Sequence, residues 1–407
     1  MTSMKAFSLS PETRSGQAPL LVCLAAMLSL AVAMGIGRFA FTPLFPLMVR
    51  DGLLNVEAGS LLAAGNYLGY LVGALLAAQI RVKPASLLAL GLISTVLVTA
   101  AMGWSSSLVS WAGLRFIAGV MSAWTLVATS AWGLGWLAAV GRPNLAGVIF
   151  AGVGLGIVAT GMFCLIAAVR GTSSLEMWVE LAALATMAVL ISLAVSWRLP
   201  APGIGTRASA SEPPVSPARS GTMGIIFCYS LFGFGYILPA TYLPELARQL
   251  VDDPQVFGWA WPLFGLAAAL STVVVARSLK HVSRLGLWAA CHLCMGIGVL
   301  LPSLWTTLAS VGLAALLVGS TFMVITMLGM QEARARLQNN ATLILGRMTA
   351  GFALGQLMGP VVSIVIGRFT ADHAIALNYA LALSAAGLFA SACYLWWEHA
   401  TLPIKEH

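Results

Sequence analysis

Long apolar segments separated by short polar loops follow one another along almost the whole chain. Each segment holds roughly 20 to 30 residues, which is the length that crosses a lipid bilayer as an α-helix. The pattern therefore predicts an all-α integral membrane protein with twelve transmembrane helices. We expect these helices over residues 19–49, 56–80, 85–104, 108–137, 144–169, 177–197, 222–246, 256–277, 285–302, 306–330, 341–366 and 375–397.

One connecting segment, residues 198–221, differs from the other loops in length and composition. It is rich in Pro, Ser, Ala and Gly and has no apolar periodicity, as is typical of a flexible linker. It divides the chain into an N-terminal six-helix bundle, residues 19–197, and a C-terminal six-helix bundle, residues 222–397. Residues 1–18 and 398–407 are expected to be cytoplasmic tails, on the same side of the membrane as the linker.

Composition and charge exclude other classes of protein. The chain is 59% hydrophobic and 8% charged, whereas a soluble domain carries about 25% charged residues. Its net charge of +8 forms no basic stripe, so nucleic-acid binding is excluded. With the N-terminus in the cytoplasm, fourteen of the 21 lysines and arginines fall on the cytoplasmic side, and the positive-inside rule then places both termini there. The outer side holds Arg50, Arg170, Arg248 and Arg368, and the spans hold Arg38, Arg115 and Arg347.

The second half of the sequence repeats the first at a nearly constant offset of 198 to 200 residues. The matching positions are Gly35, Gly37 and Pro46 with Gly233, Gly235 and Pro244, Ser110 and Gly119 with Ser310 and Gly319, and Gly152 and Gly156 with Gly351 and Gly355. Two six-helix halves in the same orientation form a parallel repeat. The first apolar run, which contains the signal-peptide-like Ala31-Val32-Ala33, belongs to this repeat, so we expect it to remain as the first helix.

On these motifs the chain resembles the major facilitator superfamily across nearly its whole length. The segments GIGRFAFTPLFPLM (residues 35–48) and GQLMGP (residues 355–360) resemble its YbfB/YjiJ-like branch. Arg115-x-x-x-Gly119 is similar to the fourth-helix motif, with Ala118 where a glutamine is common. Gly73, Leu75 and Arg81 fit the motif between helices two and three, but Ala77 replaces its acid, so the conformational latch attributed to that acid is not implied.

The resemblance implies two bundles that rock about a central cavity, in a bacterial-type inner (plasma) membrane. We therefore expect a monomeric secondary active or facilitative transporter of a small organic solute, with anions among the candidates. A coupling proton or ion is a further candidate partner, and no cofactor is expected. One alternative is a drug or metabolite efflux pump of the same fold. Another is a non-transporting membrane sensor or assembly factor built on a carrier scaffold.

Two arginines lie deep inside predicted spans. Arg38 precedes Arg50 by twelve residues, so it lies roughly 18 Å from the outer end of its helix, where an arginine costs about 2.5–3.5 kcal/mol on insertion scales. In the repeat, Tyr236 stands opposite Arg38, and Ala315 stands opposite Arg115. The scaffold is repeated but the arginines are not, which favours a role in binding an anion such as a carboxylate.

Each arginine also has a structural interpretation. Arg38 can bond to carbonyls freed by Pro43 and Pro46 or reach towards Glu57, and Arg115 can bond between helices. The full candidate set for substrate binding is Arg38, Thr42, Asn66, Tyr67, Arg115, Tyr229, Tyr236 and Gln356. The set assigned to hinges and close helix packing is Gly35, Gly37, Pro43, Pro46, Gly233, Gly235, Pro239 and Pro244.

The sequence contains no catalytic constellation, so we expect no enzyme. Cys291-His292-x-Cys294 places three potential metal ligands in one apolar run, and we expect these side chains to pack between helices and to bind no metal. The acids closest to the spans, Glu57, Glu180, Glu245 and Glu332, all lie near span ends. Their position weakens the case for a proton relay through a buried carboxylate.

Overall fold

A computed structural model of the protein describes residues 11–79, 82–199, 222–250, 259–279, 282–336, 341–369 and 373–401. Every element within these ranges is a helix. The first half comprises α1 (Pro11–Leu30), η1 (Ala31–Ile36), α2 (Phe41–Arg50), α3 (Val56–Ala77), α4 (Pro84–Trp104), α5 (Leu108–Thr129), η2 (Ser130–Leu134), α6 (Gly135–Ala139), η3 (Pro143–Leu145), α7 (Ala146–Val169) and α8 (Ser174–Arg198). The second half comprises α9 (Thr222–Leu250), α11 (Ala260–Ser278), α12 (Arg284–Leu304), α13 (Leu308–Arg336), α14 (Ala341–Gly367) and α15 (His373–Thr401).

Twelve of these helices, or chains of consecutive helices, are long and apolar enough to cross a membrane. This confirms the number and order of spans predicted from the sequence. The first span, Ala18–Arg50, joins α1, η1 and α2, and the fourth, Leu108–Ala139, contains the π-helix η2. Three helices end four or more residues later than predicted, since α9 continues to Leu250, α13 to Arg336 and α15 to Thr401. Charged residues that the sequence placed in the adjoining loop and tail therefore lie within helices.

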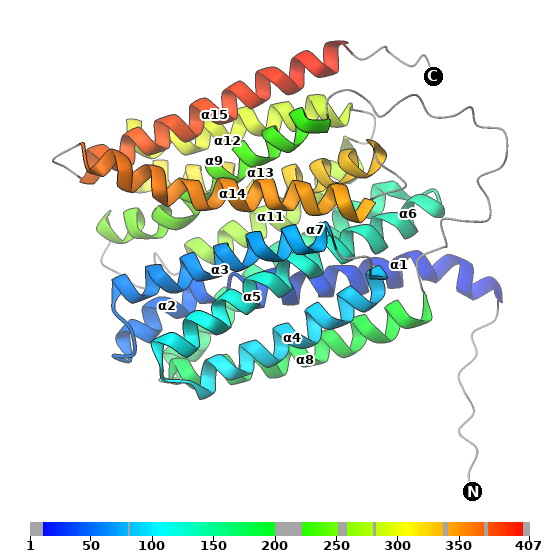
Figure 1. Cartoon of the computed structure of the whole chain (residues 1–407), viewed down its shortest axis with the longest axis horizontal. Coiled ribbons are helices and arrows are strands. Elements are labelled where there is room, and N and C mark those ends of the chain that lie inside the picture. Colours follow the sequence, from blue (N-terminus) through cyan, green and yellow to red (C-terminus); the bar gives the residue numbers. More distant parts are fainter. Residues whose placement is uncertain are drawn as a thin grey trace, which may run out of the picture.

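The two halves of the chain lie side by side, with α1 to α8 in the lower part of Figure 1 and α9 to α15 in the upper part. They meet mainly where α7 packs on α11 and where α3 packs on α14. α1 begins, α8 ends, α9 begins and α15 ends at the right of the view. We call this side the linker end, because α8 ends and α9 begins there, next to the predicted linker. The opposite side, where Arg50 and Arg170 lie, is the loop end.

The same close helix contact occurs once in each half. α7 crosses the first span at Gly156, where an added Cβ would collide with the carbonyl oxygen of Ala31. α14 crosses α9 at Gly355, where an added Cβ would collide with the carbonyl oxygen of Ser230. Gly355 follows Gly156 by 199 residues, and Ser230 follows Ala31 by the same offset. The sequence repeat is therefore also a repeat in packing, as the parallel two-bundle arrangement predicts.

Alanine at Gly156 or at Gly355 is expected to lower the free energy of unfolding by about 1–3 kcal/mol, because the new methyl group forces two backbones apart. Gly113→Ala and Gly312→Ala are matched controls, since these glycines obey the same offset and have open space where the Cβ would lie. The controls are expected to be neutral or slightly stabilising, because alanine favours helix. Thermal unfolding in detergent compares the four variants, and equal stability in all of them would contradict this packing.

At the loop end, Asp51 links the first span to the sixth. Its carboxylate accepts hydrogen bonds from the backbone N–H of Ser174 at the start of α8 (2.7 Å) and from the Arg50 side chain (2.8 Å). Burial by itself raises the pKa of Asp51, but the bonds from Arg50 and Ser174 outweigh it and hold the pKa below its ordinary value. Such a carboxyl group stabilises the fold above its unfolded-state pKa and loses this contribution as the pH falls through the folded-state pKa.

We therefore expect Asp51→Asn to be less stable than the unmodified protein near neutral pH and equally stable in acid. The difference in melting temperature should shrink below about pH 4, where a free aspartate protonates. Thermal unfolding of both proteins across a pH series measures this difference. A difference that stays constant with pH would show that the Asp51 charge contributes nothing.

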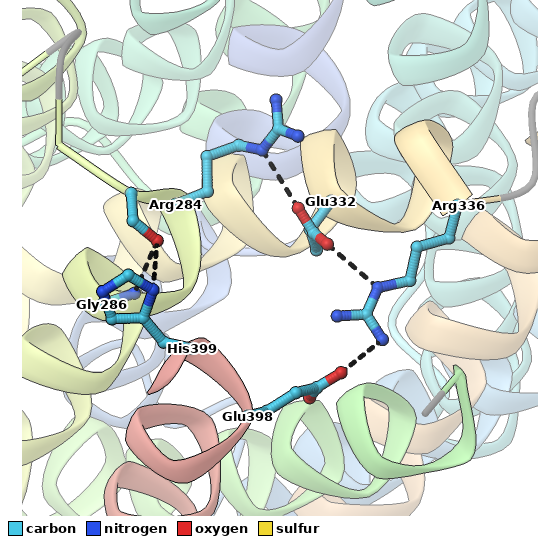
Figure 2. A network of polar contacts seen from close by, with 7 residues as sticks. Arg284, Gly286, Glu332, Arg336, Glu398 and His399 are labelled. Atoms are coloured by element: carbon cyan, nitrogen blue, oxygen red, sulfur yellow. Dashed lines mark hydrogen bonds and ion pairs between the residues drawn. The ribbon is translucent and has the colours of Figure 1, made fainter. Parts of the chain in front are cut away.

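A network of charged side chains joins three helices at the linker end of the second half (Figure 2). Glu332 on α13 accepts from Arg284 Nε on α12 (3.0 Å) and from Arg336 Nε one turn further along α13 (2.9 Å). Arg336 also pairs with Glu398 on α15 (2.8 Å). The side chains of Glu332, Arg336 and Glu398 are buried, whereas that of Arg284 is 48% exposed. The two acids and two bases leave the network without net charge.

Candidate functional site

The first span loses regular α-helical bonding about half-way along. η1 (Ala31–Ile36) is a π-helix, in which hydrogen bonds join residues five apart, as between the Gly37 N–H and the Val32 carbonyl (2.8 Å). α2 begins only at Phe41, so Arg38 lies in the turn between these helices. Single π-helical turns are frequent at functional sites, and here the turn places an arginine at mid-span.

Arg115 on α5 binds the backbone carbonyls of this turn. Pro43 has no N–H to donate to the Phe39 carbonyl, and Thr42 donates to that carbonyl instead (3.1 Å). The Arg38 carbonyl, which Thr42 would bond in a regular α-helix, accepts from Arg115 Nη2 (3.0 Å). The Gly37 carbonyl, one residue earlier, accepts from Arg115 Nη1 (3.1 Å). The geometry matches the helix-to-helix interpretation of Arg115, which holds the turn that carries Arg38.

Arg38 reaches across the boundary between the two halves. Its side chain is buried, and Nη2 donates to Oε1 of Gln356 on α14. The guanidinium carbon lies 3.8 Å from the centroid of the Tyr70 ring, a cation–π contact worth about 2 kcal/mol or more when desolvated. Arg38 Nε and Nη1 and Gln356 Nε2 have no hydrogen-bond partner among the residues that the structure describes. Three N–H-bearing nitrogens are therefore buried close together without an acceptor.

A small enclosed cavity adjoins this contact. Its walls are Met34, Phe39, Tyr70, Leu126, Tyr229, Phe322, Met323, Thr326 and Phe352, and the Phe39 and Tyr70 rings also contact the Arg38 guanidinium. Its volume is about 10 Å³, enough for one water molecule. The lining comes from both halves, so the centre of the molecule is closed in this conformation.

Two candidates on α3, Asn66 and Tyr67, lie beside the arginines. Asn66 is buried and donates to the backbone carbonyl of Arg115 (3.0 Å). The Tyr67 ring centroid lies 5.7 Å from the guanidinium carbon of Arg38. Thr42 is half-buried one turn beyond Arg38, and its backbone N–H donates to the Phe39 carbonyl.

The two tyrosine candidates on α9 lie in an aromatic cluster of the second half. Tyr229 lines the cavity and packs against Trp288 with ring centroids 6.1 Å apart. Tyr236 stacks nearly parallel on Phe322, with centroids 4.4 Å apart and an interplanar angle of 9°. Tyr236 is the repeat counterpart of Arg38, so the first half contributes the charge and the second half contributes an aromatic wall.

The glycines assigned to close packing all lie at tight contacts. An added Cβ at Gly35, Gly37, Gly233 or Gly235 would collide with Gly156, Thr95, Phe352 or Leu388 respectively. Among the prolines, Pro46 lies exposed inside α2 and Pro239 lies buried inside α9. The side chain of Pro244 lies outside the described residues, as does that of Glu57. Pro43 acts through the N–H that it lacks. Thr42 bonds the Phe39 carbonyl in its place, and this leaves the Arg38 carbonyl free for Arg115.

A second polar contact between the halves lies towards the linker end. Arg334 Nη1 on α13 donates to the carbonyl of Ala131 (3.0 Å), which belongs to the π-helix η2. The Arg334 guanidinium packs against Gly135, so that a Cβ added to this glycine would lie 2.9 Å from Arg334 Nη2. The sequence placed Arg334 in a cytoplasmic loop, but α13 extends far enough to bring it against the first half. Arginines thus bond backbone carbonyls of the π-helix η2 and of the turn that follows the π-helix η1.

His292 is a packed core residue, as expected from the sequence. Trp288 Nε1 donates to His292 Nε2 (2.9 Å), so the ring proton is on Nδ1, which lies 2.7 Å from the Ser391 hydroxyl. Both ring nitrogens are engaged, so His292 has no lone pair left for the metal site that its spacing with Cys291 and Cys294 resembles.

Sequence reasoning missed most of the aromatic lining. Phe39, Tyr70, Phe322 and Phe352 were not among the candidates, although all four line the cavity. A signal was present for Tyr70, which follows Asn66 by four residues and therefore shares its helical face. No comparable signal marks the phenylalanines, because apolar residues occur on every face of these helices.

Comparison with known proteins decides the family. The family model described as uncharacterised MFS-type transporter YbfB matches residues 30–395. The chain belongs to this major facilitator family. The family consists of transporters, which confirms that the protein is a transporter and not an enzyme.

Solved structures confirm the fold of the transporter. Matches include 277 solved chains, among them the crystal structure of the human organic anion transporter MFSD10 (TETRAN). That structure aligns with a TM-score of 0.67 and 16% sequence identity over 95% of this chain and 100% of that chain. No curated protein sequence matches the chain. At this identity the likeness concerns the fold alone.

Proposed function

We propose that the transporter carries a small organic anion across the membrane by alternating access, with Arg38 as the residue that binds the anion. One observation carries this proposal: the buried contact of Arg38 with Gln356 leaves three N–H-bearing nitrogens without an acceptor. A buried charge that lacks a full set of partners costs several kcal/mol. The cation–π contact with Tyr70 offsets part of that cost but supplies no acceptor. An anion that accepts from these nitrogens would offset the rest.

Alternating access is supported by the closed centre. A cavity of about 10 Å³ is far below the roughly 300–1,000 Å³ of a small-molecule site, so the halves must separate for a solute to enter. Arg38 bonds one half to the other at the centre, and Arg334 does so towards the linker end. We propose that the Arg334 contact breaks when the cavity opens towards the linker end, and that this end faces the cytoplasm.

The human organic anion transporter MFSD10, which shares the fold, is an example of this fold carrying anions, consistent with an anionic substrate. Efflux of cationic drugs is less well supported, because the charged groups at the candidate site are the arginines Arg38 and Arg115. The buried carboxylates of Glu332 and Glu398 lie at the linker end and pair with arginines. We further propose that the protein works as a monomer in a bacterial-type inner membrane.

Counterflow in proteoliposomes tests the proposal. Vesicles containing the purified transporter and a high internal concentration of one unlabelled organic acid would be placed in a trace of the same labelled acid. Accumulation of label above that in protein-free vesicles is expected for at least one acid. Repeating the assay with and without a pH gradient tests for a coupling proton. Accumulation of organic cations but of no acid would favour the efflux alternative.

A further inference from the structure

We infer that the transported anion is an aromatic monocarboxylate, an inference that rests on the proposed function and specifies its substrate class. Three features of the site carry it: the number of arginines with a free terminal donor, the shape of the free donors, and the composition of the walls.

Of the two arginines at the site, only Arg38 has a terminal nitrogen free for a ligand. Both terminal nitrogens of Arg115 are bonded to backbone carbonyls of the first span (3.0 and 3.1 Å), and its guanidinium lies over the Phe41 ring, 4.7 Å from the centroid. Arg38 keeps Nε and Nη1 unpaired, whereas Arg115 keeps Nε alone. One carboxylate can bond Arg38, whereas a second carboxylate on the same ligand would be buried against aromatic rings with no free terminal arginine nitrogen to bond, at a cost of several kcal/mol.

The free donors favour a planar acceptor with two oxygens. A guanidinium and an amide are both flat, and hydrogen bonding holds the amide of Gln356 against Arg38. Their unpaired nitrogens are Nε and Nη1 of Arg38 and Nε2 of Gln356. A carboxylate oxygen accepts more than one hydrogen bond, and carboxylates match the arginine fork in shape. Phosphate esters at neutral pH carry more charge than Arg38 balances.

The walls favour an aromatic ring behind that carboxylate. Aromatic side chains pack edge to face across the boundary between the halves, with the ring centroids of Phe39 and Phe322 6.2 Å apart and those of Tyr70 and Phe352 6.4 Å apart. The nearly parallel pair of Tyr236 and Phe322 extends this wall into the second half. Ring pairs contribute about 0.5–1.5 kcal/mol beyond the area that they bury. When the halves separate, the rings on each side are exposed to a solute that can replace their mutual contacts.

A set of six-membered-ring ligands tests the inference on the purified full-length protein. Thermal shift and counterflow would be measured with benzoate, cyclohexanecarboxylate, benzamide, benzylamine and terephthalate, which vary charge and aromaticity at nearly constant size. Benzoate is expected to bind about three- to ten-fold more tightly than cyclohexanecarboxylate. Benzamide, benzylamine and terephthalate are expected to give no shift and no counterflow.

A variant isolates the contribution of the ring walls. In Phe352→Leu the preference for benzoate over cyclohexanecarboxylate is expected to disappear, whereas Phe150→Leu, which removes a buried ring outside the cavity, is expected to keep it. If Phe352→Leu does not fold, the ligand series on the unmodified protein still decides the matter.

The possible results separate the two levels of the proposal. Equal binding of benzoate and cyclohexanecarboxylate, or transport of terephthalate, would overturn the aromatic monocarboxylate and leave an anion carrier. Counterflow of benzamide or benzylamine at the rate of benzoate, or counterflow of none of these acids and of no other organic acid, would overturn the anion carrier itself.

Discussion

Arg38→Ala is expected to abolish uptake of the proposed anionic substrate while membrane insertion survives. The variant removes the positive charge and all the donors that Arg38 offers at the boundary between the halves. A hydrogen bond to a charged group contributes about 1.5–3 kcal/mol, so the loss of a two-point contact should weaken binding at least a hundred-fold. Arg38→Lys should also fail, because an ammonium group cannot hold Gln356 and a carboxylate in one plane.

Uptake into proteoliposomes, normalised to the amount of inserted protein, measures this effect. Arg347→Ala is the matched control, because Arg347 also lies on a spanning helix but is exposed. Gln356→Glu sharpens the test, since it places a carboxylate of nearly the same shape on the donors of Arg38. That variant is expected to insert normally and to lose anion binding by competition. Normal uptake in Arg38→Ala would remove Arg38 from the site.

Glu332→Ala is expected to lower the free energy of unfolding by about 3–5 kcal/mol, the cost of breaking a buried ion pair. The Glu332 carboxylate forms ion pairs with both Arg284 and Arg336, and the side chain of Arg336 is only 1% exposed. Removing the acid leaves two arginines to share the remaining carboxylate of Glu398. Arg284→Ala should cost at most about 1 kcal/mol, because its side chain is 48% exposed.

Thermal and denaturant unfolding in detergent measure the stability of these variants. Glu180→Ala is the control, because Glu180 is an exposed acid on α8, where a substitution changes stability by within about 0.5 kcal/mol. If Glu332→Ala unfolds like Glu180→Ala, the linker-end network contributes little to stability.

The twelve spans could be predicted because the thickness of the bilayer sets the length of an apolar helix. The depth of Arg38 in the membrane followed from counting residues. Its selection as a candidate for substrate binding followed from the repeat, in which Tyr236 takes its place. Bonding between helices was one of two interpretations of Arg115, but the carbonyls that it binds could not be predicted, because the Arg38 carbonyl becomes free only when Pro43 and Thr42 change the bonding of the turn. That rearrangement is a property of backbone geometry and has no signature in hydropathy.

The linker-end network and the aromatic cavity were missed for different reasons. Glu332 and Arg336 stand four residues apart, a spacing typical of a helix pair, but the predicted span ended before them. Glu398 is distant in sequence and lay in the predicted tail. The cavity walls were missed because a helix between lipid and protein is apolar on both faces, so periodicity does not distinguish a ring that faces solute from one that faces lipid.

The π-helix in the first span also fixes the direction in which Arg38 points. A π-helical turn contains one residue more than an α-helical turn, and one residue corresponds to about 100° of rotation in an α-helix. Deleting a single residue from Ala31–Ile36 would restore regular winding and rotate everything beyond it by roughly that angle. Arg38 would then point away from Gln356, and Phe39 or its neighbour would take its place. A one-residue change in helical phase would therefore convert the proposed anion-binding carrier into a scaffold with the same helices and an apolar centre.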